Sequence, residues 1–281
     1  MPVDGVYTPE FSWLNWGGDI SVVAGVFILE ALYLLSVGPL QRRFPGSSEV
    51  STRKIVFFSI GLWSIFFALY SPLDQLSDHY LFSAHMVQHL LLVLVGPPLM
   101  LLGTPGWMLR PLLGIPGVFG LGRVLTFPVL AALLFNLVFA IWHVPAIYEA
   151  GLNSLWVHIL QHLTFIATGV IMWWPVLSPM KELPRLPYAG QVLYLFVLSV
   201  PPAIVGALIT FADGILYETY AAAPEIWGIS TQADQQIGGV IMKLPGFMIF
   251  IVAAGIIFFT WAAKEEEKDR LEAAERLKDL N

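Results

Sequence analysis

The stretch LFSAHMVQHLLLVLVGPPLMLL, residues 81–102, decides the fold class of this chain. It contains no Asp, Glu, Lys or Arg. As a helix that rises about 1.5 Å per residue, it would cross the hydrocarbon layer of a bilayer, which is about 30 Å thick. Only helices and closed barrels satisfy their backbone hydrogen bonds in lipid, and the stretch lacks the period-2 alternation of barrel strands. It therefore predicts a transmembrane helix.

Apolar stretches of similar length recur along the whole chain, which has 281 residues, 57% of them hydrophobic and only 12% charged. A typical soluble domain carries about twice that charged fraction. The sequence predicts an all-α integral membrane protein, a bundle of about seven transmembrane helices that forms a single multi-pass domain over residues 1–281. The predicted spans are residues 19–37, 55–70, 81–102, 124–142, 155–174, 189–211 and 238–263.

The basic residues predict which way the bundle faces. Nearly all Lys and Arg residues follow the odd-numbered spans, as Arg42 and Lys181 do, and only Lys243 falls elsewhere. By the positive-inside rule that side is cytoplasmic, so we expect the N-terminus outside and the C-terminus in the cytoplasm. Residues 264–281 are expected to continue the last helix as a charged cytoplasmic tail. The first 18 residues contain no Lys or Arg, which argues against a cleavable signal peptide.

Several local features interrupt the apolar pattern. Residues 104–122 are rich in Gly and Pro and predict a re-entrant or interfacial segment on the cytoplasmic face. The pair Pro97 and Pro98 predicts a kink, because proline breaks the hydrogen bonding of a helix. Trp173 and Trp174, near the cytoplasmic end of the fifth span, are typical of an interfacial aromatic belt.

The histidines form the most informative pattern. The chain has no cysteine, which excludes disulfides, thiolate metal sites and iron–sulfur clusters. The segments His85-Met-Val-Gln-His89 and His158-Ile-Leu-Gln-His162 repeat one motif at the same depth, in the outer halves of two spans of equal direction. A spacing of four residues places both rings on one helix face, where they can bind one metal ion. With His143 at the outer end of the fourth span, facing pairs would gather five imidazoles, which suit copper, zinc, iron or nickel.

Other residues on the outer side are weaker candidates. Asp234, just before the last span, would bind the metal, orient an imidazole or cap its own helix. His79, Asp78 and Met86 are further candidate ligands of lower weight. The competing interpretation is that each histidine only packs and hydrogen-bonds inside the bundle, although polar groups in membrane helices tend to mark function. The Glu of a His-Glu-x-x-His motif is absent, so a zinc protease would lack its general base.

These residues also resemble a known family. The run Ser-Ala-His85-Met-Val-Gln-His89-Leu-Leu-Leu, followed by Gly-Pro-Pro-Leu and Leu-Gly-Thr-Pro, is similar to the signature of the multi-span CtaG family. The same holds for Trp142-His143-Val-Pro-x-x-Tyr148, His158-x-x-Gln-His162 and Asp234-Gln235-Gln236. The resemblance implies an assembly factor for the haem–copper cytochrome c oxidase, distinct from the single-span copper-delivery protein that shares the name. One departure is Gln161, which stands before the second histidine where a Glu is expected in the family, so one negative charge is missing.

The resemblance also implies a metal, partners and a location. The metal is expected to be copper, while zinc and iron stay open because the spacing does not select among them. The expected partners are subunits of cytochrome c oxidase, periplasmic copper chaperones and the lipid bilayer, with no nucleic acid, and a homo-oligomer is left open. The protein is expected in the bacterial plasma membrane with its metal site facing the periplasm or exterior. The residues carried over to that site are His85, His89, His143, His158, His162 and Asp234.

The leading hypothesis is thus a metallochaperone rather than an enzyme. A membrane b-type haem protein would use the same histidines as axial ligands. A metal transporter would fit the broken helices, although the polar residues cluster at one face instead of forming a path across the membrane. A membrane enzyme with a metal-activated water is the fourth alternative.

Overall fold

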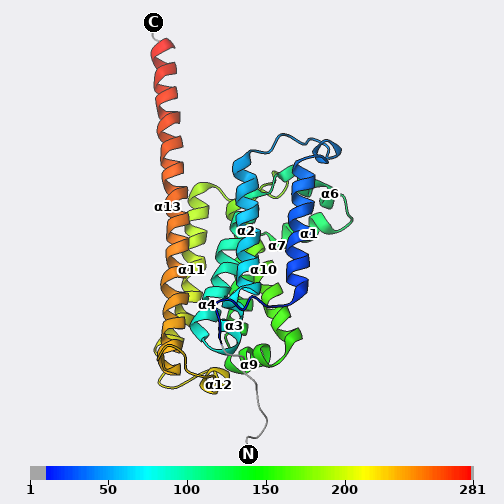
Figure 1. The fold of residues 1–281 in the computed structure, drawn as a ribbon. Coiled ribbons are helices and arrows are strands. Elements are labelled where there is room, and N and C mark those ends of the chain that lie inside the picture. Colours follow the sequence, from blue (N-terminus) through cyan, green and yellow to red (C-terminus); the bar gives the residue numbers. More distant parts are fainter. Residues whose placement is uncertain (1–10, 280–281) are drawn as a thin grey trace, which may run out of the picture.

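The computed structural model describes residues 11–279, which form helices joined by loops and contain no strand (Figure 1). Six stretches of this part are long and apolar enough to cross a membrane, and a bent helix pair brings the number to as many as seven. The all-helical fold with about seven candidate spans is therefore confirmed. The six stretches are α1 (Ile20–Val37), α2 (Thr52–Tyr70), the run Phe82–Gly103, α10 (Leu155–Leu177), α11 (Tyr188–Thr210) and α13 (Thr231–Asp279).

Short helices cover the two ends of the bundle. Three of them, α3 (Pro72–His79), α9 (Pro145–Asn153) and α12 (Glu218–Ala221), lie at one end (Figure 1). At the other end are η1 (Gln41–Arg43) and α6 (Gly106–Leu113), and there Arg110 forms an ion pair of 2.8 Å with Glu182. Beyond this second end, α13 projects from the bundle as one continuous helix through the charged residues that follow position 263 (Figure 1).

The predicted fourth span, residues 124–142, is not one straight helix. Its apolar core forms α8 (Pro128–Trp142), while its first residues belong to α7 (Val118–Leu125), and the two helices meet at an angle of 75°. The residue before a proline is pushed out of the helical region, and Phe127 accordingly adopts an extended conformation ahead of Pro128. The expected start of this span was therefore wrong by about one turn. The segment predicted to be re-entrant or interfacial folds as α6 and most of α7.

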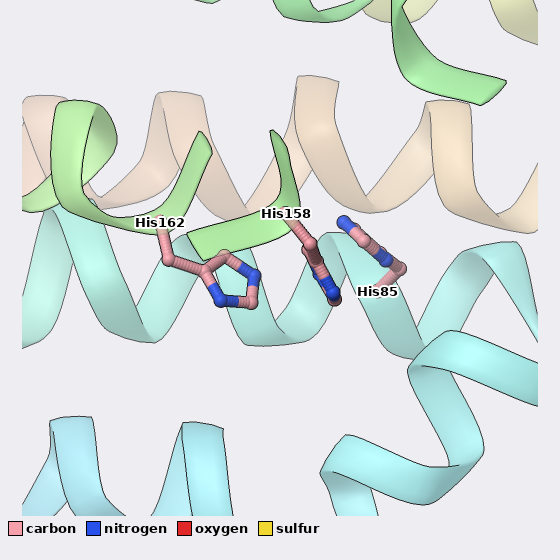
Figure 2. Close-up of side chains that lie close together, drawn as sticks. All are labelled: His85, His158 and His162. Atoms are coloured by element: carbon pink, nitrogen blue, oxygen red, sulfur yellow. The ribbon is translucent and has the colours of Figure 1, made fainter. Parts of the chain in front are cut away.

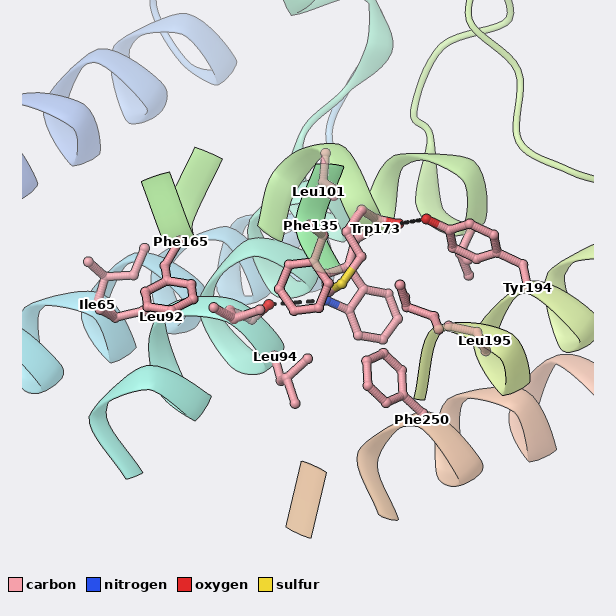
Figure 3. Packing of buried hydrophobic residues seen from close by; sticks show 14 of the residues in the cluster. Ile65, Leu92, Leu94, Leu101, Phe135, Phe165, Trp173, Tyr194, Leu195 and Phe250 are labelled. Carbon is pink, nitrogen blue, oxygen red and sulfur yellow. Dashed lines mark hydrogen bonds between the residues drawn. The ribbon is translucent and has the colours of Figure 1, made fainter. Parts of the chain in front are cut away.

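The third span is broken into α4 (Phe82–Leu90), the π-helical turn η2 (Leu91–Val95) and α5 (Gly96–Gly103). Pro97 has no N–H to bond the carbonyl of Val93, four residues earlier. The indole of Trp173 donates to that carbonyl instead, at 3.1 Å (Figure 3). A buried carbonyl left without a partner would cost about 1–3 kcal/mol. Trp173 is therefore a core residue, 2% exposed, and its assignment to an interfacial belt was wrong.

Small residues allow the long helices to approach closely. A Cβ built at Gly61 of α2 would lie 2.7 Å from the carbonyl oxygen of Gly96, so a side chain there is excluded. A Cβ at Gly206 of α11 would lie 2.8 Å from the carbonyl oxygen of Gly239 in α13. Membrane helices pack in this way because lipid supplies no hydrophobic drive for association, so close backbone contact and van der Waals packing dominate.

The main core is a cluster of buried aromatic and aliphatic side chains contributed by several helices (Figure 3). Phe165 of α10 and Leu92 of η2 are fully buried there, and Phe135 of α8 is 2% exposed. The ring of Phe165 also lies 4.5 Å from the ring of His89, measured between centroids. The core therefore packs directly against the histidines.

Candidate metal centre

Two helices carry the two predicted histidine pairs and hold them face to face. Within α4, the rings of His85 and His89 have their centroids 4.2 Å apart, and within α10 those of His158 and His162 are 4.3 Å apart. Across the helices, His85 lies 5.8 Å from His158 and His89 lies 5.9 Å from His162. The spacing of four residues thus places each pair on one face, and the packing of α10 against η2 and α5, which continue the span begun by α4, brings the pairs together.

Three of these histidines form a group suited to one ion (Figure 2). Each of His85, His158 and His162 offers a ring nitrogen, and these nitrogens all lie within 4.8 Å of one another. Imidazole nitrogens bind zinc at about 2.0–2.1 Å, so two ligands of one ion are at most about 4 Å apart. The rings need only a small rotation to meet that limit.

His89 and His143 continue the cluster on the other side of His85. The Nε2 atoms of His85 and His89 are 2.8 Å apart, and the ring centroids of His89 and His143 are 6.2 Å apart. His143 Nδ1 lies 2.6 Å from the carbonyl oxygen of Phe139. A carbonyl can only accept, so Nδ1 of His143 carries the proton and Nε2 keeps a free lone pair, the form that binds metals.

The cluster contains buried polar atoms that no protein group satisfies. His89 Nδ1, His143 Nε2, His158 Nε2 and His162 Nε2 are all buried and have no hydrogen-bond partner. About 90% or more of buried polar groups in proteins are hydrogen-bonded, so several orphans in one place require an explanation. A metal ion bound to these nitrogens would provide one.

Two carboxylates of α3 stand beside the cluster. Asp78 Oδ2 is 3.5 Å from His158 Nδ1 and is placed to orient that ring. Burial raises the pKa of Asp78, and burial together with the charge of Asp78 raises the pKa of Asp74 to about 8. His79, the other weak candidate on α3, is exposed at the end of the helix and does not belong to the group of nitrogens around His85.

Asp234 acts on the helix of the first histidine pair instead of facing the rings. Its Oδ2 accepts from the backbone N–H of Phe82 at 2.6 Å, and its Oδ1 accepts from that of Ser83 at 3.2 Å. It stands in the first turn of α13, so it does not cap its own helix. A carboxylate satisfies the free N–H groups at a helix N-terminus and complements the helix dipole. Asp234 therefore fixes the start of α4, one turn before His85.

A tyrosine pair that the sequence did not reveal sets the orientation of His85. The hydroxyl of Tyr220 donates to the carbonyl of Ser77 at 2.7 Å and lies 3.3 Å from His85 Nδ1. It is also 2.9 Å from the hydroxyl of Tyr148. Because the single proton of Tyr220 is used on Ser77, its oxygen accepts from His85 Nδ1–H, and the Nε2 atom of His85 is left unprotonated and accepts from Nε2–H of His89. Tyr148 stands in the Trp142–Tyr148 motif, but no sequence signal marked Tyr220.

The comparisons with known proteins identify the family. A family model described as "Cytochrome c oxidase caa3 assembly factor (Caa3_CtaG)" matches residues 31–264. The chain belongs to this family. The resemblance to the CtaG family seen in the sequence is thereby confirmed.

Other similar proteins are uncharacterised. One from Mycobacterium bovis is 26% identical over 256 residues, which covers 84% of this chain and 38% of that protein. One from Mycobacterium leprae is 25% identical over 202 residues, which covers 66% of this chain and 30% of the relative. The chain thus spans less than two fifths of the length of these relatives. No solved structure matches.

The two glutamines of this CtaG chain's repeated motif have different surroundings. Gln88 donates to the carbonyl of Ala68 at 2.9 Å and to Asp74 Oδ1 at 2.8 Å, which ties α4 to α2 and α3. Gln161 is 1% exposed, and its amide nitrogen has no partner. The position where an acid is expected in the family is therefore buried beside His162 with unused hydrogen-bonding capacity. Met86 is also buried and packs in a cluster with Met242.

Proposed function

We propose that this caa3 assembly factor binds copper in its histidine cluster and passes it to cytochrome c oxidase during assembly of the enzyme. The family supports the role in oxidase assembly. The observation that supports metal binding is the set of four buried imidazole nitrogens without a hydrogen-bond partner. Copper is the choice because imidazole is a good ligand for it and because the oxidase of a haem–copper family requires it.

The arrangement of the rings favours a small ion over haem. A porphyrin held by one ring from each helix would need free space in the plane between them. His89 lies 4.2 Å from His85, and His162 lies 4.3 Å from His158, so neighbouring imidazoles crowd that plane. The packing also argues against a continuous transport path. Phe165 and Leu92 are fully buried in the core next to the cluster, so they fill the space that such a path would need.

The protein's own groups supply the properties that reversible binding needs. Imidazoles bind the ion through unprotonated nitrogens, and the contacts of His85 and His143 with oxygen atoms fix which nitrogen is unprotonated. Asp78 Oδ2, 3.5 Å from His158 Nδ1, is placed to hold one of the ligand rings in position. Three protein ligands at one site leave a further position open, and an acceptor protein can use that position to remove the ion.

The test is elemental analysis of the purified protein from copper-replete cells. The wild-type protein should carry about one or more copper ions per chain, and the His85→Ala/His162→Ala variant should carry about one ion fewer than the wild type. His79→Ala is the matched control, because this exposed histidine lies outside the group around His85, and it should keep the wild-type copper content. A folded double variant that retains the full copper content would refute the assignment of these histidines as ligands. Zinc or iron in place of copper would refute the assignment of copper as the metal.

Delivery is tested separately in cells that lack the native protein. The double variant should leave oxidase activity low, and added copper should restore part of that activity. A variant that loses its copper but supports normal oxidase assembly would refute delivery and leave only metal storage.

A further inference from the structure

A small cavity adjoins the histidine cluster on the side away from His158. It lies among α4, η2, α8, α10, α11 and α13, and its volume is about 40 Å³. A cavity needs about 10–15 Å³ of such space to hold one water molecule, so this one can hold an ion. Most of its wall is aromatic or aliphatic, but four side chains with metal-binding atoms also line it. They are Met86, His89, His143 and Met242.

The imidazoles at this cavity have free nitrogens. His89 Nδ1 and His143 Nε2 are buried and have no hydrogen-bond partner. Since Nδ1 of His143 is occupied by the carbonyl of Phe139, its Nε2 is the deprotonated atom. Apart from Ser199, whose hydroxyl donates to the carbonyl of Phe196, no further polar side chain lines the cavity, and buried waters typically need about three hydrogen bonds. The two free nitrogens therefore match a cation better than a water.

The two methionines add soft ligands from two different helices. Met86 of α4 is 1% exposed and Met242 of α13 is 6% exposed, and both pack in the same buried cluster. Met86 also lies three residues before His89, so both side chains project from neighbouring positions of one helix face. Thioether sulfur is a weak hydrogen-bond acceptor but a soft metal ligand, and soft ligands select monovalent copper.

We propose that this chain has a second metal site, a methionine–histidine site for monovalent copper formed by Met86, His89, His143 and Met242. It is separate from the group of His85, His158 and His162, and the inference rests on the proposed copper function. His89 links the two sites, because its Nε2 lies 2.8 Å from Nε2 of His85 while its Nδ1 is free. Copper taken up by the three-histidine group would move through His89 to the thioether site.

The experiment is an anaerobic titration of the full-length, detergent-purified protein with monovalent copper against a chromophoric chelator. The wild-type chain should bind two ions. Met86→Leu/Met242→Leu should bind one, because leucine keeps nearly the same volume but has no sulfur. His158→Ala/His162→Ala should also bind one. Met172→Leu, at a fully buried methionine of the main core, is the control and should bind two.

X-ray absorption of the loaded proteins identifies the ligands. Copper in the His158→Ala/His162→Ala variant should have sulfur neighbours, and copper in Met86→Leu/Met242→Leu should have nitrogen neighbours alone. Binding of one ion that is lost with His158 and His162 but unaffected by the methionine change would overturn the second site and leave the proposed function intact. Loss of an ion from Met172→Leu as well would also overturn it, and absence of any copper from the wild-type chain would refute both proposals.

Discussion

Single hydrogen bonds decide which nitrogen each histidine presents to the cluster. The carbonyl of Phe139 holds the proton of His143 on Nδ1, and the Tyr220 oxygen does the same for His85. Both rings consequently have an unprotonated Nε2, which has no partner in His143 and lies 2.8 Å from Nε2 of His89 in His85. Partners of this kind fix the tautomer and raise the basicity of a ligand, and their loss typically costs about 10–100-fold in metal affinity.

Tyr220→Phe should therefore weaken metal binding without unfolding the protein. It removes the oxygen that accepts from His85 Nδ1, so the other tautomer becomes available and Nε2 is no longer held in its unprotonated form. We expect copper affinity to fall about 10-fold or more, measured by chelator competition. Tyr194→Phe is the control, since Tyr194 bonds the carbonyl of Met172 at 2.8 Å in the main core. Equal affinities for the two variants would contradict this role of Tyr220.

At the scale of elements, the sequence predicted what depends on local composition. The long apolar helices are readable because each needs only length and hydropathy to be recognised. The paired histidines are readable because their spacing of four fixes a shared face on any helix. The short helices α3, α9 and α12 are not, because tertiary contacts stabilise segments of this length. For the same reason the bond from Asp234 to the start of α4 and the buried position of Trp173 could not be predicted, since both depend on a distant partner.

The junction of α3 and α4 should respond to pH through Asp74. Its pKa is raised to about 8, against about 3.9 in an unfolded chain. The folded protein therefore holds a proton that the unfolded chain releases, so this contribution to stability is fully present below about pH 4 and is lost as the pH rises to about 8. Asp74→Asn mimics the protonated side chain and keeps an oxygen for the amide of Gln88.

Between pH 5 and pH 8, the melting temperature of the wild-type protein should fall relative to that of Asp74→Asn. This relative fall should be similar in any mild detergent. Intrinsic tryptophan fluorescence during heating measures it. Asp213→Asn, at an acid in the loop after α11, is the control and should follow the wild-type curve. Parallel curves for the wild type and Asp74→Asn would show that Asp74 is ionised in the folded protein.

For the whole molecule, charge and chemistry are divided between the two ends of the bundle. The basic residues of η1 and α6 lie at one end, while the histidine cluster lies towards the end covered by α3, α9 and α12 (Figure 1). Which end faces the cytoplasm is a prediction of the positive-inside rule. That direction decides the source of the metal, because a cluster open to the exterior can receive copper without its passage through the cytoplasm.

The chain has no cysteine, so single cysteines can report the orientation directly. Asn153 ends α9, at the end of the bundle towards which the histidines lie, and Ser48 lies near η1 at the opposite end; both are exposed. With a membrane-impermeant maleimide, Asn153→Cys should be labelled in intact spheroplasts and Ser48→Cys only after lysis. Because each position is the control for the other, poor accessibility of one site cannot imitate the result. The reverse pattern would place the histidines at the cytoplasmic face, and the copper would then have to be drawn from inside the cell.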